Sequence, residues 1–189
     1  MEITETLYVT DSAQWRRWLQ KNHAKKKEIW LVYYNKASGK KRIHYNDAVD
    51  GALCFGWIDS TVKKIDHHRF AQRFTPRRST SGLSQLNKER VRKLIKKDRM
   101  TPSGLKAISH VFKPHLDKVS FRIPKDIISA IKKDKLAWAH FQKLPESYKR
   151  IRIAYIIDRG RWGKKQFKSS LAHFIKMTAK GKRFGFVRE

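Results

Sequence analysis

The sequence predicts an α+β protein, in which a small antiparallel or mixed sheet with helices forms the N-terminal half and a helical region follows. Three observations support this class. Runs of aromatic and β-branched residues, which favour strands, lie before residue 80. After that residue, apolar side chains recur three and four positions apart, as on one face of a helix. The 189 residues are 40% hydrophobic and include 6 Trp, 10 Phe and 6 Tyr, which is enough for a packed core.

The first predicted elements are a helix and a β-hairpin. Asp11 or Ser12 can cap a helix that continues to about Asn22. Residues 28–34, EIWLVYY, have strand composition, and a turn signal separates them from a short alternating segment at 42–45. We therefore expect these two segments to pair as a hairpin.

A buried helix and a second hairpin are predicted next. Asn46 can cap a short helix whose apolar residues cover much of its circumference, as in a core helix. Residues 58–66 and 69–74 alternate in polarity and predict an antiparallel pair of strands. The irregular segment 75–82 then divides the chain, because its proline cannot join a central strand.

The pattern beyond this segment is helical. Ser84 caps a helix to about Lys97, and Thr101 with the following proline opens another toward Val111. Further helices are expected at 124–133, at 135–144, from there to Arg159, and at 164–180. Residues 1–80 are thus predicted to form an α+β region and residues 81–189 a helical region, packed together as one unit.

The chain is strongly basic and its charge is unevenly distributed. It carries 45 Lys and Arg against 16 Asp and Glu, a formal net charge of +29. Residues 61–100 hold 13 bases and three acids, and residues 149–168 hold eight bases and one acid. Such surpluses favour contact with a polyanion such as nucleic acid, whereas a charge that serves only solubility need not be concentrated. The candidate polyanion-binding residues are Lys88, Arg92, Lys93, Lys96, Lys97, Lys149, Arg150, Arg152, Lys164, Lys165 and Lys168.

Polar residues also gather at the second predicted hairpin. Trp57, Asp59, Gln72, Arg73 and Arg77 lie on or beside it and form a candidate pocket for a polar ligand. The structural alternative is an Asp59–Arg73 ion pair that holds the hairpin together, because buried charges are usually paired.

No catalytic residue, metal site or cofactor is predicted. Gly-rich phosphate loops, nucleophile elbows and paired-cysteine motifs are absent from the sequence. The single cysteine, Cys54, lies in an apolar helix and is expected to be a reduced core thiol. His67 and His68 are not expected to bind a metal ion together, since adjacent residues of an extended chain point in opposite directions, and a solvent-facing turn is expected instead. The sequence shows neither a signal peptide nor a membrane span, which predicts a cytoplasmic protein.

The chain resembles the YdeI/OmpD-associated family, whose members are also labelled bacteriocin-protection proteins. The resemblance is carried by an ordered series of segments, namely ALCFGWIDS at 52–60, RFAQRFTPR at 69–77, SQLNKERVRKL at 84–94, MTPSG at 100–104, LPESY at 144–148 and AKGK at 179–182. It implies a mixed N-terminal region followed by a helical one, but no reaction, cofactor or ligand. Leu83, Asp98 and Tyr155 depart from the family pattern.

These observations favour a non-enzymatic cytosolic protein whose basic surfaces contact a polyanion, with a role in stress or envelope protection implied by the resemblance. Two alternatives stay open. The protein could be a small-molecule binder or enzyme with a pocket around Trp57, Asp59 and Arg73, or a docking protein for an acidic protein partner.

Overall fold

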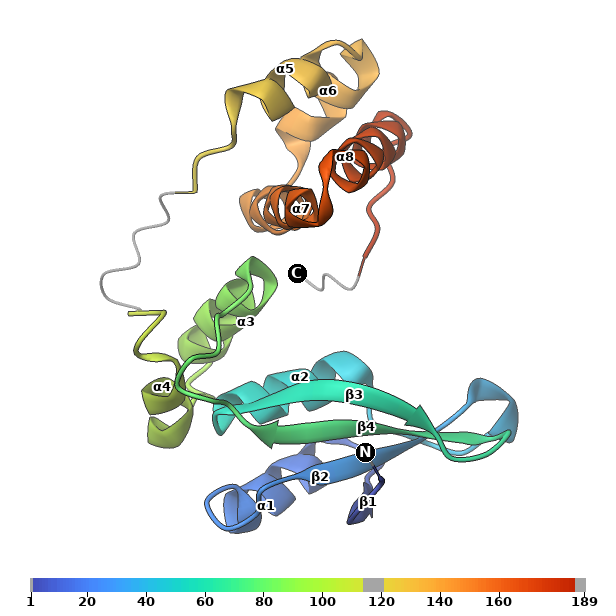
Figure 1. Ribbon diagram of the computed structural model, residues 1–189, viewed down its shortest axis with the longest axis vertical. Coiled ribbons are helices and arrows are strands. Elements are labelled where there is room, and N and C mark those ends of the chain that lie inside the picture. Colours follow the sequence, from blue (N-terminus) through green and yellow to red (C-terminus); the bar gives the residue numbers. More distant parts are fainter. Residues whose placement is uncertain (1, 114–120, 186–189) are drawn as a thin grey trace. The chain divides into compact units, whose positions relative to one another are not determined.

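The computed structural model describes residues 2–113 and 121–185. The chain divides into two compact units. The first comprises residues 1–83 and 90–114, and the second comprises residues 84–89 and 115–189. The first unit contains a four-stranded mixed sheet and the second is helical, which confirms the α+β class (Figure 1).

The sheet has the strand order β1-β2-β4-β3. β1 (Thr6–Tyr8) runs parallel to β2 (Ile29–Tyr34), and β4 (Arg69–Pro76) is antiparallel to both β2 and β3 (Trp57–Lys64). The predicted antiparallel pair is therefore confirmed as β3 and β4. A register shift between Asp59 and Val62 marks a bulge in β3.

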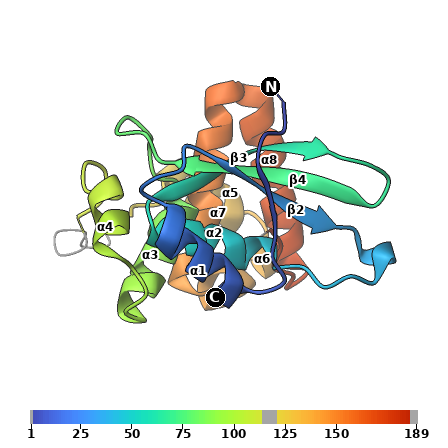
Figure 2. The ribbon, with the colours of Figure 1, turned by 90° about the horizontal axis from the view of Figure 1, so that it is seen from below.

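Two helices, α1 (Ser12–Asn22) and α2 (Tyr45–Cys54), lie on the same side of the sheet (Figure 2). The cap predicted for α1 is present, because the Asp11 carboxylate accepts hydrogen bonds from the backbone N–H groups of Ala13 and Gln14 at 2.9 and 2.8 Å. Trp15 links the two helices, because its buried indole N–H donates a hydrogen bond to the Ala48 carbonyl oxygen of α2 at 2.9 Å.

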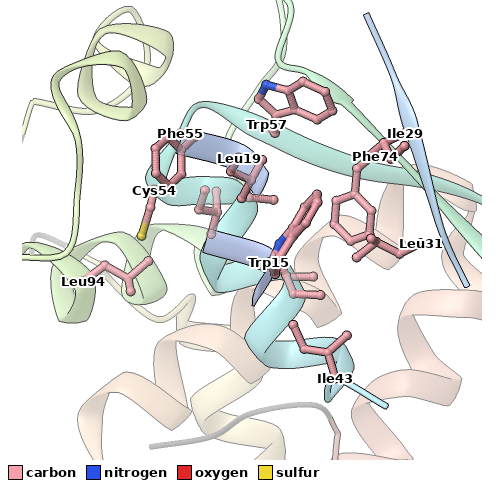
Figure 3. Packing of buried hydrophobic residues seen from close by; sticks show 14 of the residues in the cluster. Trp15, Leu19, Ile29, Leu31, Ile43, Cys54, Phe55, Trp57, Phe74 and Leu94 are labelled. Carbon is pink, nitrogen blue, oxygen red and sulfur yellow. The ribbon is translucent and has the colours of Figure 1, made fainter. Parts of the chain in front are cut away.

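Figure 3 shows the core that these helices form with the sheet. Trp15 and Leu19 of α1 are fully buried, and Ile29 and Leu31 contribute the alternating residues of β2. The two helices approach closely at Gly51, where a Cβ atom would lie 2.6 Å from the Trp15 ring. Cys54 belongs to this core with 0% exposure, as predicted.

Two more helices follow the sheet along the chain. α3 (Gln85–Lys96) begins where predicted, with Ser84 Oγ accepting a hydrogen bond from the Asn87 N–H at 3.3 Å. α4 (Pro102–Ile108) is capped by Thr101, whose hydroxyl accepts from the Gly104 N–H at 3.2 Å. A Cβ atom at Gly104 would lie 2.2 Å from the Cys54 carbonyl oxygen, so only glycine lets α4 approach the end of α2 this closely.

The second unit has a helical core of its own. Its helices are α5 (Lys125–Lys132), α6 (Lys135–Lys143), α7 (Glu146–Arg159) and α8 (Lys164–Ala179), close to the predicted bounds. A 3₁₀ turn, η2 (Gly160–Trp162), joins α7 to α8. Ile127, Ile131, Phe141, Ile153, Ile156 and Phe174 are buried together in this core.

The predicted first hairpin is wrong. Residues 42–45 do not pair with β2; the chain instead forms a 3₁₀ turn, η1 (Lys36–Ser38), and enters α2 at Tyr45. β2 is a central strand because β1, a three-residue strand that the sequence analysis missed, occupies its other edge. Asn46 is not the cap that was predicted, because α2 begins at Tyr45 and Asn46 lies inside the helix, where its side-chain oxygen accepts a hydrogen bond from Arg90. The residue that precedes the helix, His44, makes no side-chain cap.

Within the described residues, no helix combines the length and apolar character needed to cross a membrane.

Candidate functional site

The five residues of the candidate pocket do not lie on one side of the sheet. In the β2–β4 register, Gln72 is opposite Leu31 and faces the helices, whereas Arg73 is opposite Trp30 and faces the other way. Arg73 donates through Nε to Glu28 Oε2 at 2.8 Å. The predicted Asp59–Arg73 ion pair is therefore not formed, because strand alternation separates the two side chains.

Trp57 and Gln72 have structural partners. The Trp57 side chain is 1% exposed, and its indole N–H donates to the His23 carbonyl oxygen at 3.1 Å. Gln72 is buried and donates to the Ser60 carbonyl oxygen at 3.0 Å, close to the bulge in β3. Both residues thus stabilise the first unit.

Asp59 and Arg77 remain as the polar centre of this region. Arg77 is 8% exposed; its Nη1 donates to the Gly82 carbonyl oxygen at 2.7 Å, while Nε and Nη2 are buried without a partner among the described residues. Burial lowers the pKa of Arg77, and the nearby Asp59 carboxylate partly opposes this effect. Asp59 accepts a hydrogen bond from the Tyr45 hydroxyl at 2.7 Å.

Two tyrosines share this environment. Burial raises the pKa of Tyr45 above its usual value, and the hydrogen bond to Asp59 raises it further. Burial also raises the pKa of Tyr33, whose hydroxyl has no hydrogen-bond partner among the described residues. Since Asp59 acts on Tyr33, Tyr45 and Arg77, it is the common neighbour of this polar cluster.

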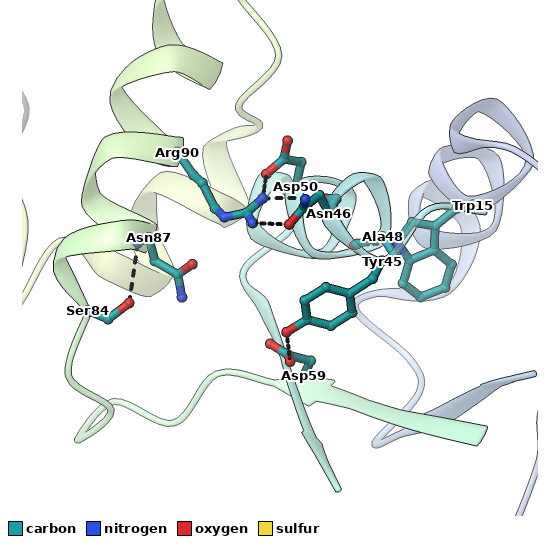
Figure 4. A network of polar contacts seen from close by, with 9 residues as sticks. All are labelled: Trp15, Tyr45, Asn46, Ala48, Asp50, Asp59, Ser84, Asn87 and Arg90. Carbon is teal, nitrogen blue, oxygen red and sulfur yellow. Dashed lines mark hydrogen bonds and ion pairs between the residues drawn. The ribbon is translucent and has the colours of Figure 1, made fainter. Parts of the chain in front are cut away.

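Arg90 forms a second polar network, drawn in Figure 4. Its guanidinium donates to Asp50 Oδ1 and to Asn46 Oδ1, both at 2.5 Å, and so ties α3 to α2. The sequence analysis missed Tyr33, Tyr45 and this network. The available signal was the pair Asn46 and Asp50, two polar side chains four residues apart in a helix that is apolar or Gly from Ala48 onward except at Asp50.

The cations of α3 differ in exposure. Lys93, Lys96 and Lys97 are exposed, and no ion pair engages them within the described part of the chain. Lys88 and Arg92 are half-buried, and the Arg92 guanidinium lies 5.5 Å from the centre of the Phe112 ring. The exposed ammonium groups are therefore the lysines of the last turn and just beyond it.

The candidate cations of α7 have partners within the second unit. Lys149 Nζ donates to Glu146 Oε1 at 2.7 Å and to the Gln142 carbonyl oxygen at 3.1 Å. Arg150 binds Glu89, also of the second unit, through Nε at 2.6 Å. Arg152 is 9% exposed, its guanidinium stacks 3.9 Å from the centre of the Phe184 ring, and burial lowers its pKa.

The cations at the start of α8 are exposed. Lys164, Lys165 and Lys168 are all open to solvent and have no ion pair within the described ranges. Trp162, which the sequence analysis did not single out, precedes them and is 73% exposed. Its position between two glycines, outside the apolar repeat of either helix, was the signal that marks it as a surface residue.

Neither Cys54 nor the histidines form a reactive or metal-binding centre in the described residues. Burial raises the pKa of the Cys54 thiol, which disfavours the nucleophilic thiolate. His67 and His68 are exposed at the turn between β3 and β4, as predicted. In residues 2–113 and 121–185, no three His, Cys, Asp or Glu side chains gather as a metal site.

Two family models match the chain. Residues 7–107, more than half of it, match the family described as Domain of unknown function (DUF8412). Residues 120–181 match the family described as Bacteriocin-protection, YdeI or OmpD-Associated, which confirms the resemblance for this part. The segments between 52 and 104 that also carried the resemblance lie within the first match. No curated protein and no solved structure matches the chain.

Proposed function

The chain belongs to the family defined by the domain of unknown function DUF8412, and we propose that it is a non-enzymatic polyanion-binding protein that uses two groups of exposed lysines. One group, Lys93, Lys96 and Lys97, lies at the end of α3, and the other, Lys164, Lys165 and Lys168, lies at the start of α8. Nucleic acid is the polyanion that we favour, with contacts to phosphates rather than to bases in these two groups.

The observation that carries the proposal is that these six lysines have no acidic partner among the described residues, whereas acids in other parts of the chain are held in ion pairs. Glu5, Glu28, Asp50, Asp66, Glu89, Glu146 and Asp158 each bind a cation. The acids therefore neutralise cations elsewhere, and both groups of lysines keep their positive field. A field of this kind attracts phosphates and speeds association.

The test is fluorescence anisotropy with labelled oligonucleotides of mixed sequence at increasing salt. Affinity should fall on a log-log scale with a slope of about −0.9 for each phosphate neutralised on duplex DNA. The triple variant Lys93→Glu, Lys96→Glu, Lys97→Glu should lower both the affinity at low salt and the slope. Its matched control, Lys133→Glu, Lys135→Glu, Lys143→Glu, changes the net charge equally at exposed sites of the second unit. No binding at low salt, or equal losses in both triple variants, would contradict the proposal.

An acidic protein is the alternative polyanion. Affinity purification from lysate with and without nuclease distinguishes the two, because partners held through nucleic acid are lost after digestion while a directly docked acidic protein is retained. We propose a cytosolic location, which is supported by the single cysteine being buried and free of a disulfide. Fractionation of cells that produce a tagged chain tests this placement.

A protective role is suggested by the description of the second matching family. We propose it for this chain as a consequence of polyanion binding, so loss of binding and loss of protection should coincide. Survival of a deletion strain exposed to bacteriocin, complemented with wild type or with the α3 triple variant, tests this link. Full rescue by the triple variant would separate protection from polyanion contact.

A small polar ligand at Asp59 and Arg77 is the second candidate function. It is favoured by the buried Nε and Nη2 groups of Arg77 and by the Tyr33 hydroxyl, which lack partners among the described residues. Burying such groups without a hydrogen bond costs about 1–3 kcal/mol each, so a ligand that accepts from them would stabilise the fold. A thermal-shift screen of small carboxylates and phosphates should give hits with wild type that Arg77→Met abolishes. A screen without hits contradicts this candidate.

A further inference from the structure

The junction between α7 and α8 presents an aromatic ring to solvent. α7 ends at Arg159, the 3₁₀ turn η2 follows, and Gly163, at φ 118°, turns the chain into α8. Trp162 at this corner is 73% exposed and is the most exposed large apolar side chain of the described residues. Tyr155, two helical turns earlier, is 48% exposed. An exposed indole offers a flat apolar surface that is available to stack with another ring.

Exposed cations flank this ring in the sequence. Lys164 and Lys165 follow it directly, Lys168 lies one turn further along α8, and all three are exposed. Arg161, which precedes Trp162, is 81% exposed, and its ion pair with Asp158 at 3.2 Å lies at the surface. Such a pair contributes little and is readily exchanged for another anion.

The first turn of α8 also lacks a compensating negative charge. Gly163 supplies no side-chain cap, and the turn contains no acid. Lys164 and Lys165 instead place two positive charges at the positive end of the helix dipole, which is unfavourable in the free protein. A bound anion would relieve this repulsion and accept hydrogen bonds from the uncapped N–H groups.

We propose that this corner binds single-stranded nucleic acid. Trp162 stacks on an unpaired base, and Lys164, Lys165 and Lys168 contact the flanking phosphates. Aromatic platforms beside cationic grooves bind single strands because every base has a stacking face, whereas the bases of a duplex already stack on one another. This inference rests on the proposed polyanion binding and adds the strand type and the stacking residue.

A membrane surface is the competing use of Trp and Lys, and the corner fits it less well. Membrane-surface helices bury a continuous apolar face, whereas the apolar residues of α8 are used inside the second unit. Phe167, Leu171, Phe174 and Ile175 all belong to that core or pack against it. Only one exposed indole would then be left to enter the lipid at the start of α8.

The experiment compares a labelled oligothymidylate of about 20 nucleotides with a duplex of equal length, at roughly 50 mM salt where phosphate contacts are strong. The wild type should prefer the single strand. Trp162→Ala should weaken single-strand binding about 10-fold and duplex binding less than about 2-fold, and Trp162→Phe should restore most of the loss. Lys164→Glu with Lys165→Glu should weaken both.

The matched controls use the surface at the start of α6. Leu136 is 66% exposed, and Lys133 and Lys135 beside it are also exposed. Leu136→Ala should leave both affinities unchanged, and Lys133→Glu with Lys135→Glu should cost less than the pair in α8. Circular dichroism of each variant should match wild type.

Three outcomes would overturn the inference while leaving the proposed function in place. These are equal binding of single strand and duplex, an unchanged single-strand affinity in Trp162→Ala, and failure of Trp162→Phe to restore binding. If Trp162→Ala instead abolishes binding to anionic lipid vesicles and leaves nucleic acid unaffected, the corner is a membrane contact. If wild type binds neither nucleic acid at low salt, both the inference and the proposed function are wrong.

Discussion

α7 and the first turns of α8 each contribute three cations to the predicted polyanion surface, and the fold uses the two sets differently. Lys149, Arg150 and Arg152 of α7 bind an acid, a carbonyl oxygen or an aromatic ring. The three lysines at the start of α8 extend into solvent. Equal charge in the sequence therefore gives unequal charge at the surface.

The difference follows from how much of each helix is covered. α7 buries six residues distributed around its circumference, so its long cationic side chains must cross apolar surface and find partners there. α8 buries only Phe174 and Thr178, both in its second half. The cationic side chains of its first turns therefore reach solvent without crossing buried apolar surface. A count of lysines and arginines along the chain overestimates the surface field where a helix is buried on several sides.

The strongest test of this contrast lies in α3, which has both kinds of cation. Arg90, whose side chain is 10% exposed, holds Asp50 and Asn46, whereas Lys93 is exposed. Arg90→Met should destabilise the protein by about 3 kcal/mol, because it leaves the Asp50 carboxylate without its cation. Lys93→Met should change stability by less than about 0.5 kcal/mol. Urea unfolding followed by circular dichroism measures the stability of both variants. Equal unfolding midpoints for Arg90→Met and Lys93→Met would contradict the distinction between cations with a partner and cations in solvent.

A smaller effect is expected for the cation that stacks on a ring. Arg152→Ala removes the contact with Phe184 and the burial of the aliphatic stem, which together should cost about 2 kcal/mol. Lys168→Ala, the control in α8, should stay within about 0.5 kcal/mol of wild type. The comparison is made by thermal unfolding at fixed pH and salt. A loss in Lys168→Ala as large as that in Arg152→Ala would show that α8 is also engaged.

The helices were predictable because their signals are local. Asp11, Ser84 and Thr101 each precede an apolar repeat, and all three cap helices as expected. β1 was not predictable, because three residues are too short for a periodic pattern and their pairing with β2 spans more than 20 positions. The error at residues 42–45 has the same origin, since four alternating residues do not distinguish a strand from an extended entry into a helix.

The candidate site was predictable only in part, because partners are set by tertiary contacts. Arg73 and Asp59 are both near the second hairpin, but their partners, Glu28 and Tyr45, come from other elements. Of the candidate lysines of α3, Lys93, Lys96 and Lys97 are exposed but Lys88 is half-buried, and all three candidates at the start of α8 are exposed. Lys149 could not be distinguished from them, because its partner Gln142 belongs to the preceding helix.

Lys149 offers a third, weaker test of the comparison. Lys149→Met keeps an unbranched apolar side chain but removes the ammonium group, which lies 5.2 Å from the centre of the Phe141 ring and donates to Gln142 and Glu146. Because Glu146 is exposed and can be solvated, the cost should be only about 1 kcal/mol. Lys164→Met is the matched control and should be neutral within about 0.5 kcal/mol. A neutral result for Lys149→Met would place this lysine with the free cations.

The smallest expected effect on the free energy of unfolding depends on pH, because protonation of Glu28 breaks its ion pair with Arg73. Hydrogen bonds from the Thr4 hydroxyl and from Arg73 lower the pKa of Glu28 in the folded state. A depressed folded-state pKa contributes stability that is complete above the unfolded value of about 4.3 and is lost as pH falls through the folded value. Glu28→Gln should therefore be less stable than wild type by about 1 kcal/mol or less near pH 7, and this difference should shrink below about pH 4.

Unfolding midpoints at a series of pH values measure this difference, with Glu2→Gln as the control for loss of one negative charge at an exposed site. The difference between wild type and Glu28→Gln should narrow on acidification because protonated Glu28 no longer holds Arg73 as an ion pair. A difference that stays constant from neutral to acidic pH would mean that Arg73 is held by packing alone. Arg73 would then be positioned by its strand rather than by its acid, and the division of cations would depend on burial and not on pairing.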